Sequence, residues 1–244
     1  MNQVTGPSFR PLYLQIRDLV TQSLDAGEWE PGEAIPSEIE LAARYQVSQG
    51  TVRKAIDELA SENIVVRRQG KGTFVATHTE EKSSLFRFLR IRRTDGVHEY
   101  PHSRLIDLRR GKASVEIARM LLLRQGEAVI LLRRVLEYSG EPVLLDEITL
   151  PAALFRGLTK ARYDAYRGST YSFFETQFGV RMLRADERIK AISADAASAA
   201  ILQVPVDSPL LAVERTAYTY GNRPVEWRRG LCTTKHHYYL NQLG

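Results

Sequence analysis

Two signals for the start of a helix stand close together in the first quarter of the chain, and they constrain the local fold strongly. Ser37 followed by Glu40 is a capping box, in which each side chain bonds a backbone amide that the first helical turn leaves unpaired. Ser48 is a second residue of the type that caps a helix. The first helix therefore ends near Tyr45, and a tight turn leads into the next. This spacing predicts a helix-turn-helix motif.

An amphipathic helix precedes this pair, and a hairpin follows it. Apolar residues recur at helical spacing over residues 12–24. Residues 64–68 and 73–75 are rich in β-branched and aromatic side chains and enclose the turn Gln69-Gly70-Lys71-Gly72. This order of elements predicts a winged helix-turn-helix domain, in which the second helix of the motif enters the major groove of DNA.

Polar and basic residues cluster where this domain would touch DNA, namely at the helix starts and at the hairpin tip. The net charge of the whole chain, +5, is a poor guide, since residues 1–78 hold eight Lys/Arg against ten Asp/Glu. Local placement decides contact with phosphates. The residues expected to bind DNA are Ser37, Ser48, Gln49, Gly50, Thr51, Arg53, Lys54, Gln69, Gly70, Lys71, Gly72 and Thr73.

The segments PLYLQIRDLV and PGEAIPSEIELAARYQVSQGTVRKAIDELASENIVVRRQGKGTFV resemble the winged helix-turn-helix of GntR-family repressors, from about Pro11 to Val75. Two positions depart from the family pattern, because Ile39 and Gln49 stand where arginines are common. Arginine reads guanine bidentately, whereas glutamine pairs better with adenine. We therefore expect an operator that differs from the family's usual sequence.

The chain beyond this domain becomes rich in predicted strands. The polar stretch from His78 to Ser84 has no periodicity and predicts a linker, so we place the DNA-binding domain over residues 1–78, the linker over 79–84 and a second domain over 85–244. Strands are expected over 129–138, 142–150, 180–192, 210–220 and 224–232, and helices over 114–123, 171–178 and 194–202.

Two parts of the second domain resemble each other. Each reads helix, loop, strand, turn, Pro-Val, strand, with Arg134 matching Arg215 and Pro142 matching Pro224. This indicates a duplicated α-β-β unit that forms an antiparallel sheet with pseudo-twofold symmetry. The alternative is that any two helix-hairpin units look alike.

The second domain resembles the UTRA effector domain of HutC-type GntR regulators over about residues 85–240. The segments that carry this resemblance are RRVLEYSGEPVLLDEITLP, GSTY and RPVEWRRG. The resemblance implies a chorismate-lyase-like antiparallel sheet with flanking helices, so the fold class expected for the whole chain is α+β. An all-helical, metal-binding effector domain of the FadR type is disfavoured by the strands and by the sparse histidines.

The resemblance also implies an effector pocket formed by Arg134, Asp146, Ser169, Tyr171 and Glu226. An arginine fork and a serine at a helix N-terminus suit an anion, while a carboxylate accepts hydrogen bonds from hydroxyl or ammonium groups. Leu136 stands where sugar-phosphate readers often carry a second arginine, which favours a carboxylate over a phosphorylated metabolite. Arg93, from the basic run Arg87 to Arg93, is a further effector candidate, although this run could equally be a basic surface beside DNA.

These features together predict a transcriptional regulator rather than an enzyme. We expect a cytoplasmic homodimer that binds palindromic double-stranded operator DNA and is modulated by a small-molecule effector, with repression as the default and activation left open. Cys232 is the only cysteine, and no signal-peptide pattern, membrane span, metal site or cofactor is expected. The alternatives are a second domain that only dimerises, or a lyase-type enzyme fused to a DNA-binding domain.

Overall fold

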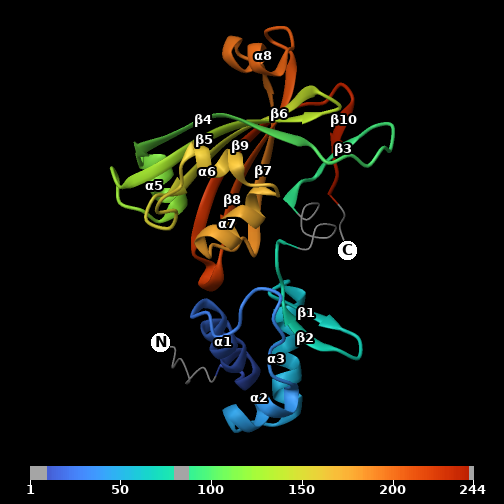
Figure 1. Cartoon of the computed structure of the whole chain (residues 1–244), viewed down its shortest axis with the longest axis vertical. Helices are drawn as coiled ribbons and strands as arrows, with labels where there is room; N and C mark the ends of the chain where they lie inside the picture. Colours follow the sequence, from blue (N-terminus) through green and yellow to red (C-terminus); the bar gives the residue numbers. More distant parts are fainter. Residues whose placement is uncertain (1–9, 80–87, 242–244) are drawn as a thin grey trace, which may run out of the picture. The chain divides into compact units, whose positions relative to one another are not determined.

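The chain divides into two compact units, Met1–Thr77 and His78–Gly244. The computed structural model describes residues 10–79 and 88–241 (Figure 1). Residues 80–84 of the predicted linker and Arg87 of the basic run lie outside the described residues. His78 does not behave as a linker residue, since it is buried in the second unit.

The first unit has the predicted order of three helices and a hairpin. Its elements are α1 (Leu12–Asp25), α2 (Glu38–Tyr45), α3 (Gln49–Ser61), β1 (Val65–Arg68) and β2 (Gly72–Val75). Both predicted caps are present, because the side chains of Ser37 and Ser48 accept hydrogen bonds from the backbone amides of Glu40 and Thr51. The buried side chains of α1 and α3 are Ile16, Val20, Leu24, Val52, Ala55, Ile56 and Leu59.

The wing, residues 65–75, depends on glycine at its tip. Strands β1 and β2 pair antiparallel, from Val65 opposite Val75 to Arg68 opposite Gly72. Gly70 and Gly72 have φ angles of 70° and 107°, a region that side chains with a Cβ disfavour. The double glycine that marked this turn in the sequence is therefore required by its backbone conformation.

The second unit is built on a six-stranded sheet with the order β4-β5-β6-β9-β8-β7, in which every neighbouring pair is antiparallel. The strands are β4 (His102–Lys112), β5 (Ala128–Tyr138), β6 (Glu141–Pro151), β7 (Arg184–Ser193), β8 (Pro209–Tyr218) and β9 (Pro224–Thr233). A smaller sheet pairs β3 (Ile91–Arg93) with β10 (His237–Tyr239). The sequence did not predict β3, β4 or β10.

The strand register supports the predicted duplication. Arg134 on β5 lies opposite Asp146 on β6, and Arg215 on β8 lies opposite Arg228 on β9. The two halves meet at the β6-β9 pair, where Glu147 faces Arg229 at the centre of the symmetry. Each half also carries a helix before its hairpin, α5 (Val115–Leu121) and α8 (Ala196–Leu202).

The strand predicted over residues 180–192 begins late, at Arg184. Val180 and Met182 are buried in the hydrophobic core, and Arg181 between them is buried and paired with Glu175. The hydrophobic pattern was therefore real, but it reflects packing rather than strand pairing. The strand predicted over 210–220 likewise ends at Tyr218.

Helices cover both faces of the sheet. Since neighbouring residues of a strand point to opposite faces, a single strand contributes side chains to the core on each side. Ile148 and Leu150 of β6 pack with α7 (Thr170–Phe178), and Leu145 packs with α8. A short helix, α6 (Lys160–Ala165), precedes α7 (Figure 1). No helix within the described ranges 10–79 and 88–241 is long and apolar enough to cross a membrane.

The core under α7 generates a stability prediction. Leu150 is fully buried, whereas Leu122 is 78% exposed in the same unit. We expect Leu150→Ala to lower the free energy of unfolding by about 2–5 kcal/mol through lost burial and the cavity left behind. The same substitution at Leu122 should change it by less than about 0.5 kcal/mol. Urea unfolding of both variants measures the difference, and equal effects would contradict this assignment of the core.

Candidate nucleic-acid interface and ligand pocket

The start of α3 presents a polar, exposed surface, as predicted for a helix that enters a DNA groove. Gln49, Gly50 and Arg53 are exposed. Ser48 and Thr51 instead stabilise the helix start, because their hydroxyl oxygens lie 2.9 Å apart and the Ser48 oxygen also accepts the amide of Thr51.

Lys54 lies on the side of α3 that faces α1. Its ammonium nitrogen is 4.0 Å from the centre of the Tyr13 ring, a cation–π contact. Arg53 turns to the other side and donates to Glu38 on α2. The two basic neighbours that the sequence grouped together therefore have different surroundings.

Glu38 is a member of this surface that the sequence analysis did not single out. Its carboxylate accepts hydrogen bonds from Gln49, Arg53 and Arg67, so it joins α2, α3 and β1. Arg67 is not among the residues predicted to bind DNA, and its partner Glu38 lies 29 residues away in the chain.

The tip of the wing exposes Gln69, Gly70, Lys71 and Gly72, while Thr73 is half-buried. The turn is closed by the amide of Lys71, which donates to the carbonyl of Arg68 at 2.9 Å. The Lys71 ammonium forms no ion pair with any residue of the described ranges, so its charge is available to a phosphate.

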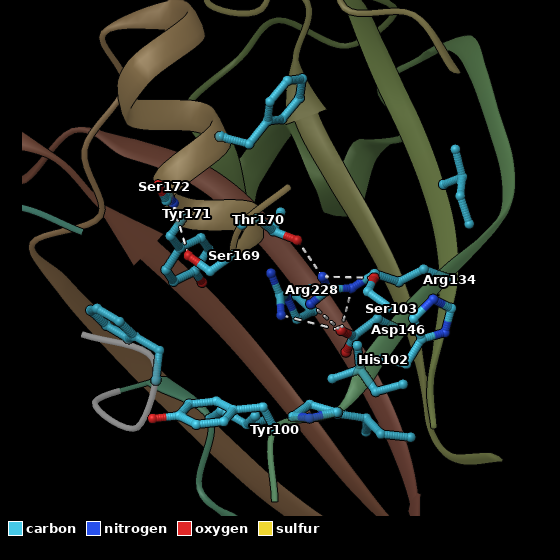
Figure 2. Close-up of a pocket in the computed structure, with 18 of the residues that line it drawn as sticks. Tyr100, His102, Ser103, Arg134, Asp146, Ser169, Thr170, Tyr171, Ser172 and Arg228 are labelled. Atoms are coloured by element: carbon cyan, nitrogen blue, oxygen red, sulfur yellow. Dashed lines mark hydrogen bonds and ion pairs between the residues drawn. The ribbon is translucent and has the colours of Figure 1, made fainter. Parts of the chain in front are cut away.

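The second unit contains a cavity of about 980 Å³, lined by strands of the sheet and by α6 and α7. Four of the predicted effector residues line it: Arg134, Asp146, Ser169 and Tyr171. Figure 2 shows Ser103, Arg134 and Asp146 close together, with Arg134 bonded to Thr170 at the start of α7. Residues distant in sequence are thus brought to one site.

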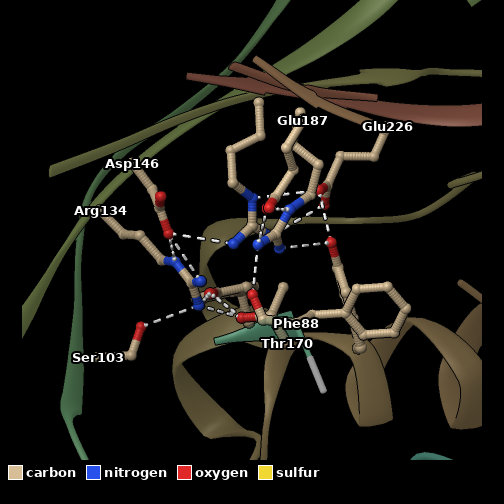
Figure 3. Close-up of polar contacts among 11 residues, drawn as sticks. Phe88, Ser103, Arg134, Asp146, Thr170, Glu187 and Glu226 are labelled. Atoms are coloured by element: carbon tan, nitrogen blue, oxygen red, sulfur yellow. Dashed lines mark hydrogen bonds and ion pairs between the residues drawn. The ribbon is translucent and has the colours of Figure 1, made fainter. Parts of the chain in front are cut away.

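Arginine and carboxylate side chains form a buried network at the floor of this cavity (Figure 3). Oδ2 of Asp146 accepts from Nε and Nη2 of Arg134, at 3.0 and 2.8 Å, and from Nη1 of Arg228 at 3.2 Å. Arg228 also donates twice to Glu226, and Arg215 donates to Glu187 at 2.7 Å. Three guanidinium groups are therefore balanced by three carboxylates.

This network sets the protonation states of its members. Burial by itself would raise the pKa of Asp146, but the guanidinium groups of Arg228 and Arg134 outweigh it and hold the pKa below the ordinary 3.8. Burial, with the charge of Glu226 nearby, raises the pKa of Tyr171 to about 12. Tyr171 therefore stays protonated and donates to Glu226 at 2.8 Å.

One oxygen of Asp146 remains open. All the hydrogen bonds that this carboxylate makes with described residues go to Oδ2. Oδ1 lies beside Gly230, where a Cβ atom would come within 3.2 Å of it, and both residues line the cavity. Because Gly230 has no side chain, no methyl group lies against Oδ1, which has no hydrogen-bond partner among the described residues.

The start of α7 offers donors on the other side. Ser169 caps the helix by accepting the amide of Ser172 at 3.0 Å. The amides of Thr170 and Tyr171 make no hydrogen bond with any residue in the described part of the chain, and both residues line the cavity. Unpaired amides at a helix N-terminus form a favourable environment for an anion.

Two predicted effector residues do not line the cavity. Glu226 is fully buried behind Tyr171 and Arg228, so its role is to hold those side chains. Arg93 is directed to Asp95 and Glu99, away from the cavity lining.

Two residues of the site were not predicted from the sequence: Arg228, which donates to Asp146, and Thr170, whose hydroxyl accepts from Arg134. The predicted duplication carried a signal for Arg228. If Pro142 is equivalent to Pro224, then Asp146 is equivalent to Arg228, since each lies four residues after its proline. The pair Arg134–Asp146 in one half therefore implies the pair Arg215–Arg228 in the other, on the same face of the sheet.

Asp146 provides a pH prediction. Because its pKa is depressed in the folded state, its stabilising contribution is complete above 3.8 and is lost as the pH falls through the lower folded-state pKa. We expect Asp146→Asn to lower the free energy of unfolding at pH 7 by about 3–5 kcal/mol, since it breaks a buried charge network. The variant should also lose less stability than the native protein on acidification.

Asp107→Asn is the matched control, since Asp107 is half-exposed and pairs with Arg109 on the same sheet. Its effect should stay below about 1 kcal/mol. Urea unfolding at neutral and acidic pH tests both variants, and an Asp146→Asn protein as stable as the control would rule out the proposed weight of the network.

Comparisons with known proteins match both units of the chain. The model of the gntR family of bacterial regulatory proteins matches residues 12–75, and the UTRA domain model matches residues 97–238. The histidine utilization repressor of Pseudomonas putida is 29% identical over 221 residues, which cover 90% of this chain and 86% of that protein. The transcriptional regulator YurK of Bacillus subtilis is 27% identical over 220 residues, 89% of each chain.

Solved structures show the same architecture. The ligand-binding domain of a regulator assigned to the GntR family from Bordetella bronchiseptica is 43% identical, with a TM-score of 0.62, and covers 64% of this chain and 98% of its own. PhnF from Mycobacterium smegmatis shares the fold over 94% of this chain and 99% of its own, with 24% identity and a TM-score of 0.55. This chain is therefore a member of the GntR family of DNA-binding transcriptional regulators, with a UTRA domain as its ligand-responsive part.

Proposed function

We propose that the protein is a cytoplasmic repressor that binds a palindromic operator as a homodimer and is released by an anionic small molecule. Three proteins similar to this chain are described as repressors. They are the histidine utilization repressor of Pseudomonas putida, the fructoselysine utilization operon repressor of Escherichia coli and the repressor NagR of Bacillus subtilis. A homodimer would present two recognition helices to two half-sites about one turn of DNA apart.

The DNA contacts in this proposal come from α3 and the wing. Gln49 and Arg53 would meet base edges, while Lys71 and the glycines of the wing tip would lie along the phosphates. Support comes from the exposure of these residues and from the unpaired Lys71 ammonium. Lys54 would reach DNA only by leaving the Tyr13 ring, so we give it the smallest part.

The effector would bridge the two sides of the cavity, and this arrangement is the observation that carries the proposal. Its anionic group would bind the amides of Thr170 and Tyr171 with the Ser169 cap, and a hydroxyl or ammonium group would donate to Oδ1 of Asp146. Arg134 would support the site rather than bind the anion alone, because its three nitrogens already donate to Asp146, Ser103, Tyr163 and Thr170.

Helix α7 offers a route from the cavity to the DNA-binding unit. One turn after Tyr171, the carboxylate of Glu175 accepts the backbone amide of His78 at 3.1 and 3.3 Å. The His78 ring lies 2.9 Å from the carbonyl of Met182 and 5.7 Å, between centroids, from the Tyr171 ring. Because His78 follows β2 closely in the chain, an effector that prefers one position of α7 would shift the population of operator-competent molecules.

The decisive experiment is binding of the full-length protein to its own upstream intergenic DNA, titrated against a panel of carboxylate and phosphate metabolites. Release of the DNA by one compound supports the proposal and identifies the effector. Specific binding that no compound alters would remove the effector part and leave a DNA-binding protein whose second unit serves another purpose.

Lys71 tests the DNA part of the proposal. We expect Lys71→Ala to weaken binding to all duplexes alike and to reduce the slope of log affinity against log salt by about one unit, since one phosphate contact is lost. Fluorescence anisotropy over a range of salt concentrations measures both quantities. An unchanged slope would mean that Lys71 does not contact a phosphate.

Gly230 tests the effector part. A Cβ at this position would lie 3.1 Å from Leu144 Cδ1 and 3.2 Å from Asp146 Oδ1, so Gly230→Ala should obstruct the open oxygen. We expect operator affinity to be retained and the effector concentration needed for release to rise about tenfold, the effect of losing roughly 1.4 kcal/mol.

Gly111→Ala is the matched control for this variant. Its Cβ would come equally close to a leucine, 3.0 Å from Leu131 Cδ1, on a strand residue that does not line the cavity. Equal effects of the two substitutions on effector release would argue against a ligand at Asp146.

A further inference from the structure

The carboxylate of Glu38 gathers hydrogen-bond donors at the face where α3 begins. Its Oε2 accepts from Nε of Arg53 at 2.9 Å and from Nε2 of Gln49 at 3.4 Å. Its Oε1 accepts from Nη2 of Arg67 at 3.0 Å. One side chain at the start of α2 therefore holds two residues of the recognition helix and one of the wing.

The contact with Glu38 occupies only one nitrogen of Arg53. Nη1 and Nη2 form no hydrogen bond with any residue that the structure describes. The Arg53 side chain is 57% exposed, against 21% for Glu38. Because a guanidinium group is a rigid, planar fork, fixing Nε also restricts the plane in which the two Nη groups point.

We propose that Arg53 reads a guanine in each operator half-site, and that Glu38 is the positioning residue that holds the Arg53 fork for this contact. A bidentate bond from two nitrogens of an arginine to O6 and N7 of guanine is the commonest specific contact in the major groove. The inference rests on the proposed contact of α3 with DNA. It adds which side chain reads a base and which one orients it.

Charge gives an independent argument for such a role. A carboxylate on a DNA-facing surface repels phosphates and so weakens binding to every sequence. Glu38 thus lowers the affinity for DNA of any sequence. Its contact with Arg53 gives a reason for a carboxylate at this position, because it orients the Arg53 side chain. Asp57 provides a contrast, because it pairs with Arg67 at 2.9 Å and forms no ion pair with Arg53 in the described structure.

The test uses the full-length protein and a pool of duplexes randomised in sequence. After selection, affinities are measured for the selected duplex, for its single-base variants and for the unselected pool. The native protein should select a guanine at one position of each half-site. Arg53→Lys should lose this preference, because lysine keeps the charge but lacks the fork.

Glu38→Gln should lower the preference for that guanine about tenfold while it raises affinity for the unselected pool. Asp57→Asn removes one negative charge from the same unit, so it should raise pool affinity as well but keep the preference. The loss of guanine preference, which only Glu38→Gln should cause, separates orientation of Arg53 from the general electrostatic effect that both variants share.

The inference is overturned by a guanine preference that survives in Arg53→Lys, or by one that Glu38→Gln and Asp57→Asn change equally. A lower melting temperature of Glu38→Gln with an unchanged preference would assign Glu38 a structural role only. If Arg53→Lys and Glu38→Gln leave the affinity for every duplex unchanged, the contact of α3 with DNA fails as well, which distinguishes the two proposals.

Discussion

Burial of arginine on one face of the sheet is the constraint on which the second unit depends. Arg134, Arg215 and Arg228 are each less than a tenth exposed, and a guanidinium group does not lose its charge at any physiological pH. Each therefore needs a carboxylate within reach, or the unpaired buried charge would cost several kcal/mol. Asp146 serves two of the three, so the register that places it opposite Arg134 determines the polarity of the cavity floor.

The duplicated halves of the sheet provide this arrangement because they have diverged in charge. The register makes Asp146 equivalent to Arg228, so a carboxylate in one half meets a guanidinium from the other. The pseudo-twofold symmetry is not exact at the cavity, because a carboxylate in one half corresponds to a guanidinium group in the other. Oδ1 of Asp146 lies there beside Gly230 without a hydrogen-bond partner among the described residues. Helix α7 then closes the site, and its Glu175 ties the cavity to the segment that follows the wing.

Much of the fold could be predicted because its signals are local. A serine cap is satisfied within three residues, so Ser37 and Ser48 determined where α2 and α3 begin. The strand predicted from Val180 was wrong at its start because periodicity reports burial and does not distinguish a core loop from a paired strand. Strand β4 was missed because, as an edge strand with mostly exposed side chains, it shows little alternation.

The sequence by itself determined the element order of the first unit, its helix-turn-helix with the wing, the two hairpins of the second unit and four residues that line the cavity, since these follow from short-range spacing and from the resemblance they carry. Only the tertiary structure decided which charges meet. It placed Glu226 behind the cavity, directed Arg93 to the surface, and buried His78 against a carboxylate 97 residues away. Such partners are selected by packing between distant segments, and no local pattern encodes them because neither residue needs the other to form its own helix or strand.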